Sequence, residues 1–363
     1  MGEGGRPMIV IDFHLDLGMN ALRWNRELIR PVPDLRAAEA GLTDEIGRAA
    51  GTVALPELRR GNVALLAATA NGRTTPAWRE APARFAASQE IAFARAAAHL
   101  AYYRALELRG QFRPIRTRPE LDAHLTAWGA RGDGQPLGYL LAIEGSDPML
   151  SPAQLEWWWN EGLRAASLAH NGEGFYAGGT GAPSGLKAGA VALLRAMESR
   201  GVALDLTHCS DRTFAEALDH FHGPVFASHS TCRALVPGPR QLTDDQIRAI
   251  AARDGVVGLA FDNSMLHPAW RRAAGLRAEV SMTAVVDHLD HICQLVGDGD
   301  HAGIGSDLDG AFGVEQCPRE LDTIADLQRF PEVMAARGYG DAEIARFMYG
   351  NWQQFLRRVL PAA

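Results

Sequence analysis

Short apolar segments alternate with longer stretches of helical period along almost the whole chain, and this alternation constrains the fold more than any other feature. Strands that alternate with helices indicate βαβ units, whose strands form a parallel sheet. Eight such units predict a closed (β/α)8 TIM-like barrel of the α/β class, with an open doubly wound sheet as the competing fold. The expected strands are residues 8–13, 62–69, 138–143, 165–169, 202–207, 225–228, 255–261 and 302–306.

Helices are expected in the intervening stretches. Thr243 and Gln246 have the spacing of a capping box at a helix start, and Gly201 follows a helical stretch as a stop. Residues 23–60 and 110–134 are longer than a barrel requires and are interpreted as elaborations. Because no linker or repeat interrupts the chain, we expect one catalytic domain over residues 1–363. The expected helices are residues 85–108, 186–200, 243–252, 283–296 and, outside the barrel at the carboxyl end, 339–359.

Length and composition exclude several classes of protein. A length of 363 residues suits one barrel with insertions, and 47% hydrophobic residues can fill a large core. The net charge is −7 and the 36 basic residues are scattered, so we expect no nucleic-acid partner. No apolar run approaches the roughly 20 residues of a membrane span, so we expect no membrane partner. Four cysteines without a CxxC pair, and no signal-peptide core before the first strand, predict reduced thiols and a cytoplasmic location.

Residues that bind metals or transfer protons follow most of the expected strands. In a (β/α)8 barrel the carboxyl ends of the strands meet on one face, where active sites are built. We therefore expect these side chains to share one cavity, and this convergence is the strongest functional signal in the sequence. The residues are His14, Asp16, Glu144, His170, His208, His229 and Asp307.

Two of these positions have a spacing that suits a shared ion. His14 and Asp16 are two residues apart, so in a strand both side chains point to the same side. A single histidine and aspartate at this spacing are common by chance, but here they end the first expected strand. Glu144 follows four apolar residues, where a carboxylate is costly to bury unless it is paired or bound to metal; a surface glutamate is the alternative.

The remaining positions suggest a second ion and an acid/base group. His208 and His229 end consecutive strands, an arrangement that suits imidazole ligation, whereas either alone would more often be a hydrogen-bonded core histidine. Asp307 and Asp309 are close enough to form an acid/base pair. Asp309 could equally be a turn residue before Gly310.

Three other patterns are interpreted as structural. The glycine spacing in residues 172–177 resembles a dinucleotide-binding loop but leads into further glycines and a proline rather than a helix. His288 and His291 share a helix with two aspartates and are expected to form a solvated charge cluster. The run of three tryptophans at 157–159 predicts helix–barrel packing, with the interface of a homodimer as the alternative.

The sequence resembles the membrane dipeptidases (renal dipeptidase-like, peptidase family M19) of the amidohydrolase superfamily. The similar motifs keep the family's order and span nearly the whole chain. The chain departs from the family's usual residues at Phe13, Leu15 and Leu308. These changes leave the metal and acid/base positions intact and bear on substrate choice. The motifs are residues 12–16, 143–145, 168–171, 205–210, 228–230, 239–244, 304–310 and 350–352.

The resemblance implies a role for each matched residue. It implies that His14 and Asp16 bind one zinc ion, that His208 and His229 bind a second, and that Glu144 bridges both. His170 would contact the scissile carbonyl, Arg240 the substrate carboxylate, and Asp307 would be the catalytic acid/base. Asp309, to which the resemblance assigns no role, is a candidate supporting residue beside Asp307. Without the resemblance, Arg240 would be interpreted as a solvated surface arginine.

The function implied is that of a binuclear zinc dipeptidase, in which a hydroxide held between the metals attacks the peptide bond of a small dipeptide. A second hypothesis keeps the metals but changes the substrate to an N-acyl amino acid, a dehydropeptide or a lactam. A third, from a different class, is a non-catalytic metal-binding barrel. That hypothesis predicts loss of ligands or of the acid/base, and every matched position is present.

Overall fold

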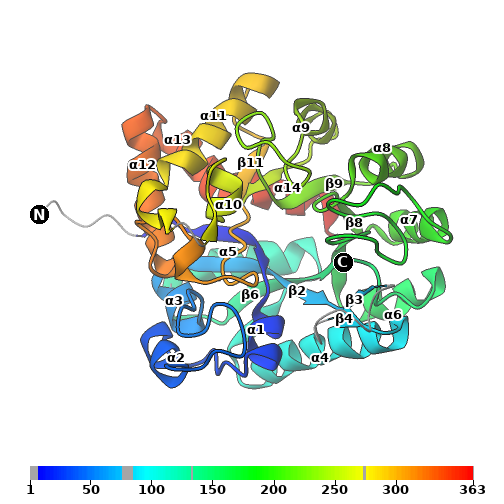
Figure 1. Cartoon of the computed structure of the whole chain (residues 1–363), viewed down its shortest axis with the longest axis horizontal. Coiled ribbons are helices and arrows are strands. Elements are labelled where there is room, and N and C mark those ends of the chain that lie inside the picture. The colour runs from blue at the N-terminus through cyan, green and yellow to red at the C-terminus, as the bar shows by residue number, and fades with distance from the viewer. Residues whose placement is uncertain (1–6, 76–84, 132–133, 273–274, 363) are drawn as a thin grey trace, which may run out of the picture.

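The computed structural model describes residues 7–75, 85–131, 134–272 and 275–362, and these form a closed barrel of eight parallel strands (Figure 1). The barrel closes because β1 pairs with the last strand on one side and with β2 on the other, and β2 pairs with β6. Round the barrel the strands are β1 (Val10–Leu15), β2 (Val63–Asn71), β6 (Leu137–Glu144), β7 (Leu163–Ser167), β8 (Ala203–Asp205), β9 (Val225–Ser230), β10 (Val257–Leu259) and β11 (Ala302–Ile304).

All eight expected strands are therefore confirmed, with shifts of a few residues at their ends. Their side chains are almost all buried, as expected for parallel strands that are covered on both faces. Gly258 and Gly305 allow the last strands to approach each other closely. A Cβ would lie 1.9 Å from the backbone oxygen of Ser228 at Gly258, and 1.7 Å from it at Gly305.

Helices surround the strands on the outside of the barrel (Figure 1). The capping box of Thr243 and Gln246 is confirmed at the start of α9, and Gly201 ends α7 in the left-handed conformation. The helices are α1 (Leu17–Arg23), α2 (Val32–Ala38), α3 (Leu55–Arg60), α4 (Gln89–Leu108), α5 (Arg118–Arg131), α6 (Leu155–Asn160), α7 (Ala190–Arg200), α8 (Asp211–His220), α9 (Asp244–Ala251), α10 (Asn263–Leu266), α11 (Thr283–Val296), α12 (Phe330–Arg337), α13 (Asp341–Ala345) and α14 (Asn351–Val359).

Two helix starts were predicted too early. Residues Phe85–Ala86 form a short strand, β4, which pairs with β3 (Arg73–Thr74), and α4 begins only after Ser88, whose side chain caps it. The stretch before Ala190 is loop, because the glycines that precede it favour turns rather than helix.

The elaborations form structure of their own. Residues 23–60 contain α2 and α3, and β5 (Phe112–Pro114) adds a ninth strand to the sheet beside the first residues of β6. Residues 132–133, within the second elaboration, lie outside the described part, as do residues 1–6 at the amino end. At the carboxyl end, Trp352 of α14 stacks on Phe13 of β1 with ring centroids 3.9 Å apart, so this helix covers the barrel as expected.

The interpretation of the residues around His288 was partly wrong. His288 is buried, and its Nδ1 accepts a hydrogen bond from the backbone of Cys232 at 3.0 Å. Burial lowers the pKa of His288 to about 4, so it is a neutral core residue. His291 does lie at the surface, where it pairs with Asp244 at 2.8 Å.

The interpretation of residues 172–177 as structural agrees with the fold, whereas the run of tryptophans is buried only in part. The glycine-rich loop after β7 is held by isolated bridges and leads to no helix before Ala190. Trp158 is buried against Phe93 of α4, while Trp157 is 39% exposed. The four cysteines form no disulfide, and within the described ranges no helix has the length and apolar character needed to cross a membrane.

Candidate active site

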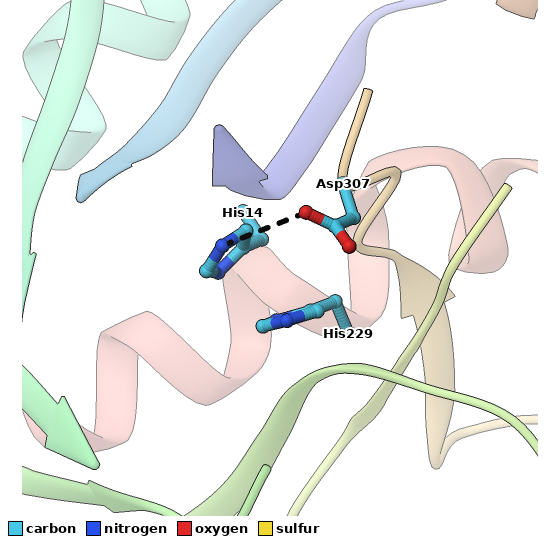
Figure 2. Close-up of side chains that lie close together, drawn as sticks. All are labelled: His14, His229 and Asp307. Atoms are coloured by element: carbon cyan, nitrogen blue, oxygen red, sulfur yellow. Dashed lines mark ion pairs between the residues drawn. The ribbon is translucent and has the colours of Figure 1, made fainter. Parts of the chain in front are cut away.

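The metal-type residues that follow the strands meet at one end of the barrel. His14 and Glu144 are near the ends of β1 and β6, and His229 lies within the last residues of β9. His170, His208 and Asp307 lie a few residues beyond β7, β8 and β11. Figure 2 shows His14, His229 and Asp307 converging from three of these elements.

Glu144 is the centre of this cluster. Its Oε1 lies 3.1 Å from His170 Nε2, 3.4 Å from the Nε2 atoms of His208 and His229, and 3.7 Å from His14 Nε2. Burial alone would raise the pKa of Glu144, but the neighbouring His170 and His14 hold it well below its ordinary value. A buried carboxylate among four imidazoles is therefore an ionised acceptor at the centre of the site.

The donor atoms of the cluster fit divalent metal ions. Within the described residues, three overlapping groups have ligand atoms no more than 4.8 Å apart. His14 Nε2 and Glu144 Oε2 are buried and have no hydrogen-bond partner in the part of the chain that the structure describes, which is costly unless another group binds them. Imidazole nitrogens and carboxylate oxygens are ligands that zinc accepts. The groups are His14, Asp16 and Glu144; Glu144, His208 and His229; and His14, His229 and Asp307.

Hydroxyl groups contact the Nδ1 atoms of His229 and His208, on the side of each ring that faces away from Glu144. Ser228 Oγ lies 2.8 Å from His229 Nδ1 and donates to the buried carboxylate of Asp205 at 2.6 Å. Thr180 Oγ1 lies 3.0 Å from His208 Nδ1. These contacts leave the Nε2 atoms directed at Glu144, and such partners are typical of metal-binding histidines.

Asp16 is fixed in the same way, through one of its two oxygens. Its Oδ1 accepts hydrogen bonds from the hydroxyl of Thr69 and, at 3.1 Å, from Asn71 Nδ2. Its Oδ2 faces His14 Nε2 at 4.0 Å, so the two side chains point to the same side as the sequence predicted. Burial, together with the charge of Glu144, raises the pKa of Asp16 to about 7.

Asp307 faces the cluster from a strained loop. Its Oδ1 lies 3.9 Å from His14 Nε2 (Figure 2). Asp307, Asp309 and Ala311 all have positive φ, at 56°, 61° and 70°, a conformation that side chains other than glycine rarely adopt. Burial, and then the charges of Asp16 and Glu144, raise the pKa of Asp307 well above its ordinary value.

Arg240 lines a cavity of about 780 Å³ together with most of the cluster, namely Asp16, Glu144, His170, His208, His229 and Asp307. The guanidinium of Arg240 donates to the backbone oxygen of His229 at 2.7 Å and to Ser230 Oγ at 3.3 Å. It is half-buried rather than a solvated surface group, so the sequence-based alternative for this residue is wrong. A fixed cation therefore lies in the same cavity as most of the metal-type residues.

Asp309 takes no part in the cluster and does not line the cavity. It is buried and accepts hydrogen bonds from the backbone nitrogens of Thr52 and Val53, and Arg26 donates to it at 3.4 Å. The side chain of Asn20 donates to the backbone oxygens of Asp16 and Asp309, at 3.0 Å each. This network joins the end of β1 to the loop that carries Asp307.

Sequence reasoning did not identify the supporting residues. Ser228 and Asp205 are polar residues within otherwise apolar strands, and that contrast was a usable signal. Arg26 lies in the mixed stretch Trp24-Asn25-Arg26-Glu27, which carried no comparable signal, and Asn20 is an isolated polar residue in the short helix α1.

Comparisons with known proteins agree with this geometry. A family model described as "Membrane dipeptidase (Peptidase family M19)" matches residues 6–363. The chain is 33% identical over 202 residues to a Klebsiella pneumoniae protein described as uncharacterized, in the pqqA 5' region, a match that covers 55% of this chain and 70% of that protein. It is 30% identical over 214 residues to an uncharacterized dipeptidase of Schizosaccharomyces pombe, covering 57% of this chain and about half (49%) of that protein.

A solved structure is also similar over almost the whole chain. It is a metallopeptidase from Rhodobacter sphaeroides, in complex with a phosphinate mimic of the dipeptide L-Ala-D-Ala. The sequences are 25% identical, the TM-score is 0.77, and the match covers 98% of this chain and 100% of that one.

Proposed function

Because the chain belongs to the membrane dipeptidase family (peptidase family M19), we propose that it hydrolyses the peptide bond of dipeptides at a site for two zinc ions. The observation that carries the proposal is the position of Glu144, whose Oε1 lies within 3.7 Å of four imidazole nitrogens. One carboxylate surrounded in this way can bridge two cations.

The chain would provide three ligands to each of these ions. His14 and Asp16 would hold one ion, His208 and His229 the other, and Glu144 would be shared between them. When bound, a pair of such ions supplies a water activated as a nucleophile near neutral pH and polarises a carbonyl group. The orphaned His14 Nε2 and Glu144 Oε2 support this assignment.

Three further residues would act on the substrate. Asp307 would take the proton of the attacking water and return it to the leaving amine as the C–N bond breaks. His170 would stabilise the negative charge that develops on the carbonyl oxygen. Arg240 would bind the free carboxylate through its planar guanidinium, which favours substrates with a carboxyl group close to the scissile bond. Asp309 would support the loop of Asp307.

The same metal ligands could also serve the hydrolysis of an N-acyl amino acid, a dehydropeptide or a lactam, and the carboxylate of such a substrate could make the same contact with Arg240. A dipeptide is favoured by the family and by the neighbouring structure that holds a dipeptide mimic. A non-catalytic barrel is disfavoured, because the ligand groups and Asp307 lie together at one end of the barrel.

The experiment that tests the proposed function is a two-by-two comparison of enzyme and substrate. Zinc-loaded wild-type protein and the Arg240→Met variant are assayed on a dipeptide and on the same dipeptide with an amidated carboxyl end. A charge-assisted contact is worth about 1.5–3 kcal/mol, so the variant should lose roughly ten- to a hundredfold in kcat/KM on the free dipeptide and far less on the amide.

An N-acyl amino acid with the same carboxyl residue serves as the competing substrate. Faster turnover of that compound than of the dipeptide would favour the hypothesis that the substrate is an N-acyl amino acid. Equal loss on both peptides, or none on either, would show that Arg240 does not recognise the carboxylate. No turnover of any dipeptide would refute the dipeptidase proposal.

A further inference from the structure

Besides Arg240, the cavity is lined by Arg23, Arg73 and Arg95, and the last two lie on the side of the barrel opposite Arg240. Three strands separate β2 from β9 in either direction round the barrel, so the ends of these two strands face each other across the site. Arg240 follows β9, whereas Arg73 follows β2. Arg95 lies on α4.

The proposed function gives the direction in which a substrate would lie, and the inference rests on it. With its carboxylate at Arg240 and its scissile carbonyl at Glu144, a dipeptide must extend its amino-terminal residue toward the end of β2. The α-amino group is attached next to the scissile carbonyl, so it stays among the carboxylates of Asp16 and Asp307. Only the side chain of that residue can extend as far as Arg73 and Arg95.

Arg73 lies in β3, two residues beyond the end of β2, and lines the cavity. Its guanidinium lies 4.7 Å from the ring centroid of Phe85, a contact that restrains the side chain. A guanidinium has several N–H donors in a planar fork, so a partner elsewhere leaves donors for a substrate carboxylate.

The acidic side chain of Glu45 also lines the cavity. Arg23 Nε donates to Glu45 Oε1 at 2.9 Å, so these two residues form an ion pair at the cavity wall. His99 is buried beside Arg95, and burial lowers its pKa to about 4, which leaves it neutral.

We propose that Arg73 and Arg95 form a subsite for the side chain of the substrate's amino-terminal residue, and that this subsite selects an acidic side chain, aspartate or glutamate. A lysine side chain at the same place would face two guanidinium groups. A neutral side chain would fit but would gain no charge-assisted hydrogen bond.

The test is a substrate series with a constant carboxyl-terminal alanine. Glu-Ala and Gln-Ala have nearly the same shape and differ in charge; Lys-Ala and Ala-Ala complete the series. For the zinc-loaded wild-type protein, kcat/KM should be about ten- to a hundredfold higher for Glu-Ala than for Gln-Ala, and lowest for Lys-Ala. This comparison requires no variant, so it does not depend on how well a mutant folds.

Variants then assign the preference to the two arginines. Arg95→Gln and Arg73→Gln should each bring the ratio of Glu-Ala to Gln-Ala turnover closer to one. Arg248→Gln is the matched control, because Arg248 pairs with Asp245 on the outer surface and its side chain is 53% exposed. It should leave the ratio as in the wild type.

The outcomes separate this inference from the proposed function. If Ala-Ala is cleaved but Glu-Ala has no advantage over Gln-Ala, the acidic subsite is refuted and the dipeptidase proposal stands. A preference that persists in both variants would also overturn the assignment to Arg73 and Arg95. If no member of the series is cleaved, the proposed function itself fails.

Discussion

Replacing Asp307 with asparagine should lower kcat by about 10²–10⁴-fold, the usual contribution of a positioned acid/base group. The asparagine keeps the shape of the side chain but cannot carry the proton between the attacking water and the leaving amine. Asp307 faces the cluster, with its Oδ1 3.9 Å from His14 Nε2. The measurement is steady-state turnover of a dipeptide together with the metal content of the same preparation.

Metal content decides between two roles for Asp307, because its carboxylate also belongs to one of the possible ligand groups. Retained metal with lost turnover supports a proton carrier, whereas lost metal would make Asp307 a ligand instead. Asp309→Asn is the control. Its carboxylate contacts Thr52, Val53 and Arg26 rather than the cavity, so turnover should change much less. The reverse result would show that Asp309 is the acid/base group.

Replacing Arg26 with methionine should destabilise the folded protein by about 3–5 kcal/mol, the usual cost of removing one partner from a buried charge network. The Arg26 side chain is only 1% exposed. Its guanidinium binds Glu39 through two hydrogen bonds of 2.8 and 3.0 Å and also donates to Asn20 and Asp309. The variant would leave the carboxylates of Glu39 and Asp309 buried without this cation.

The measurement is the unfolding midpoint in denaturant for wild type and variant at the same metal load. Arg248→Met is the matched control, since its ion pair with Asp245 is at the surface and such pairs contribute about 0–1 kcal/mol. Equal shifts for the two variants would contradict the view that the network around Arg26 holds the Asp307 loop in place.

The strands were predictable because each is an apolar run bounded by polar or glycine residues, a pattern that parallel barrel strands require. The cluster was predictable for a related reason. Once the barrel is assumed, residues at the carboxyl ends of different strands must meet, however far apart they are in sequence. His14, Glu144 and His229 follow directly from this rule.

His288 shows an error that the sequence could have prevented. Val285, His288 and Ile292 have the spacing of one helix face, and in α11 this face is buried. His288 was predicted to be exposed to solvent because aspartates lie next to it in sequence. Asp287 and Asp290, however, lie on the other face of the helix and pair with Arg337. Periodicity outweighs local charge in such a helix.

The network behind Asp307 was beyond sequence reasoning for a physical reason. Arg26 and Asp309 are 283 positions apart in sequence. The chain contains many other carboxylates with which Arg26 could form an ion pair. No period or spacing specifies such a pair. Only the packed structure brings the two groups together and excludes water from them.

The most direct test of the central claim is a zinc titration of metal-free protein, followed by elemental content and dipeptide hydrolysis in the same samples. If Glu144 bridges two ions, hydrolysis should reach its maximum at about two ions per chain. A Glu144→Gln variant should bind less metal and remain nearly inactive. Full activity at one ion per chain, or in the metal-free protein, would contradict the account.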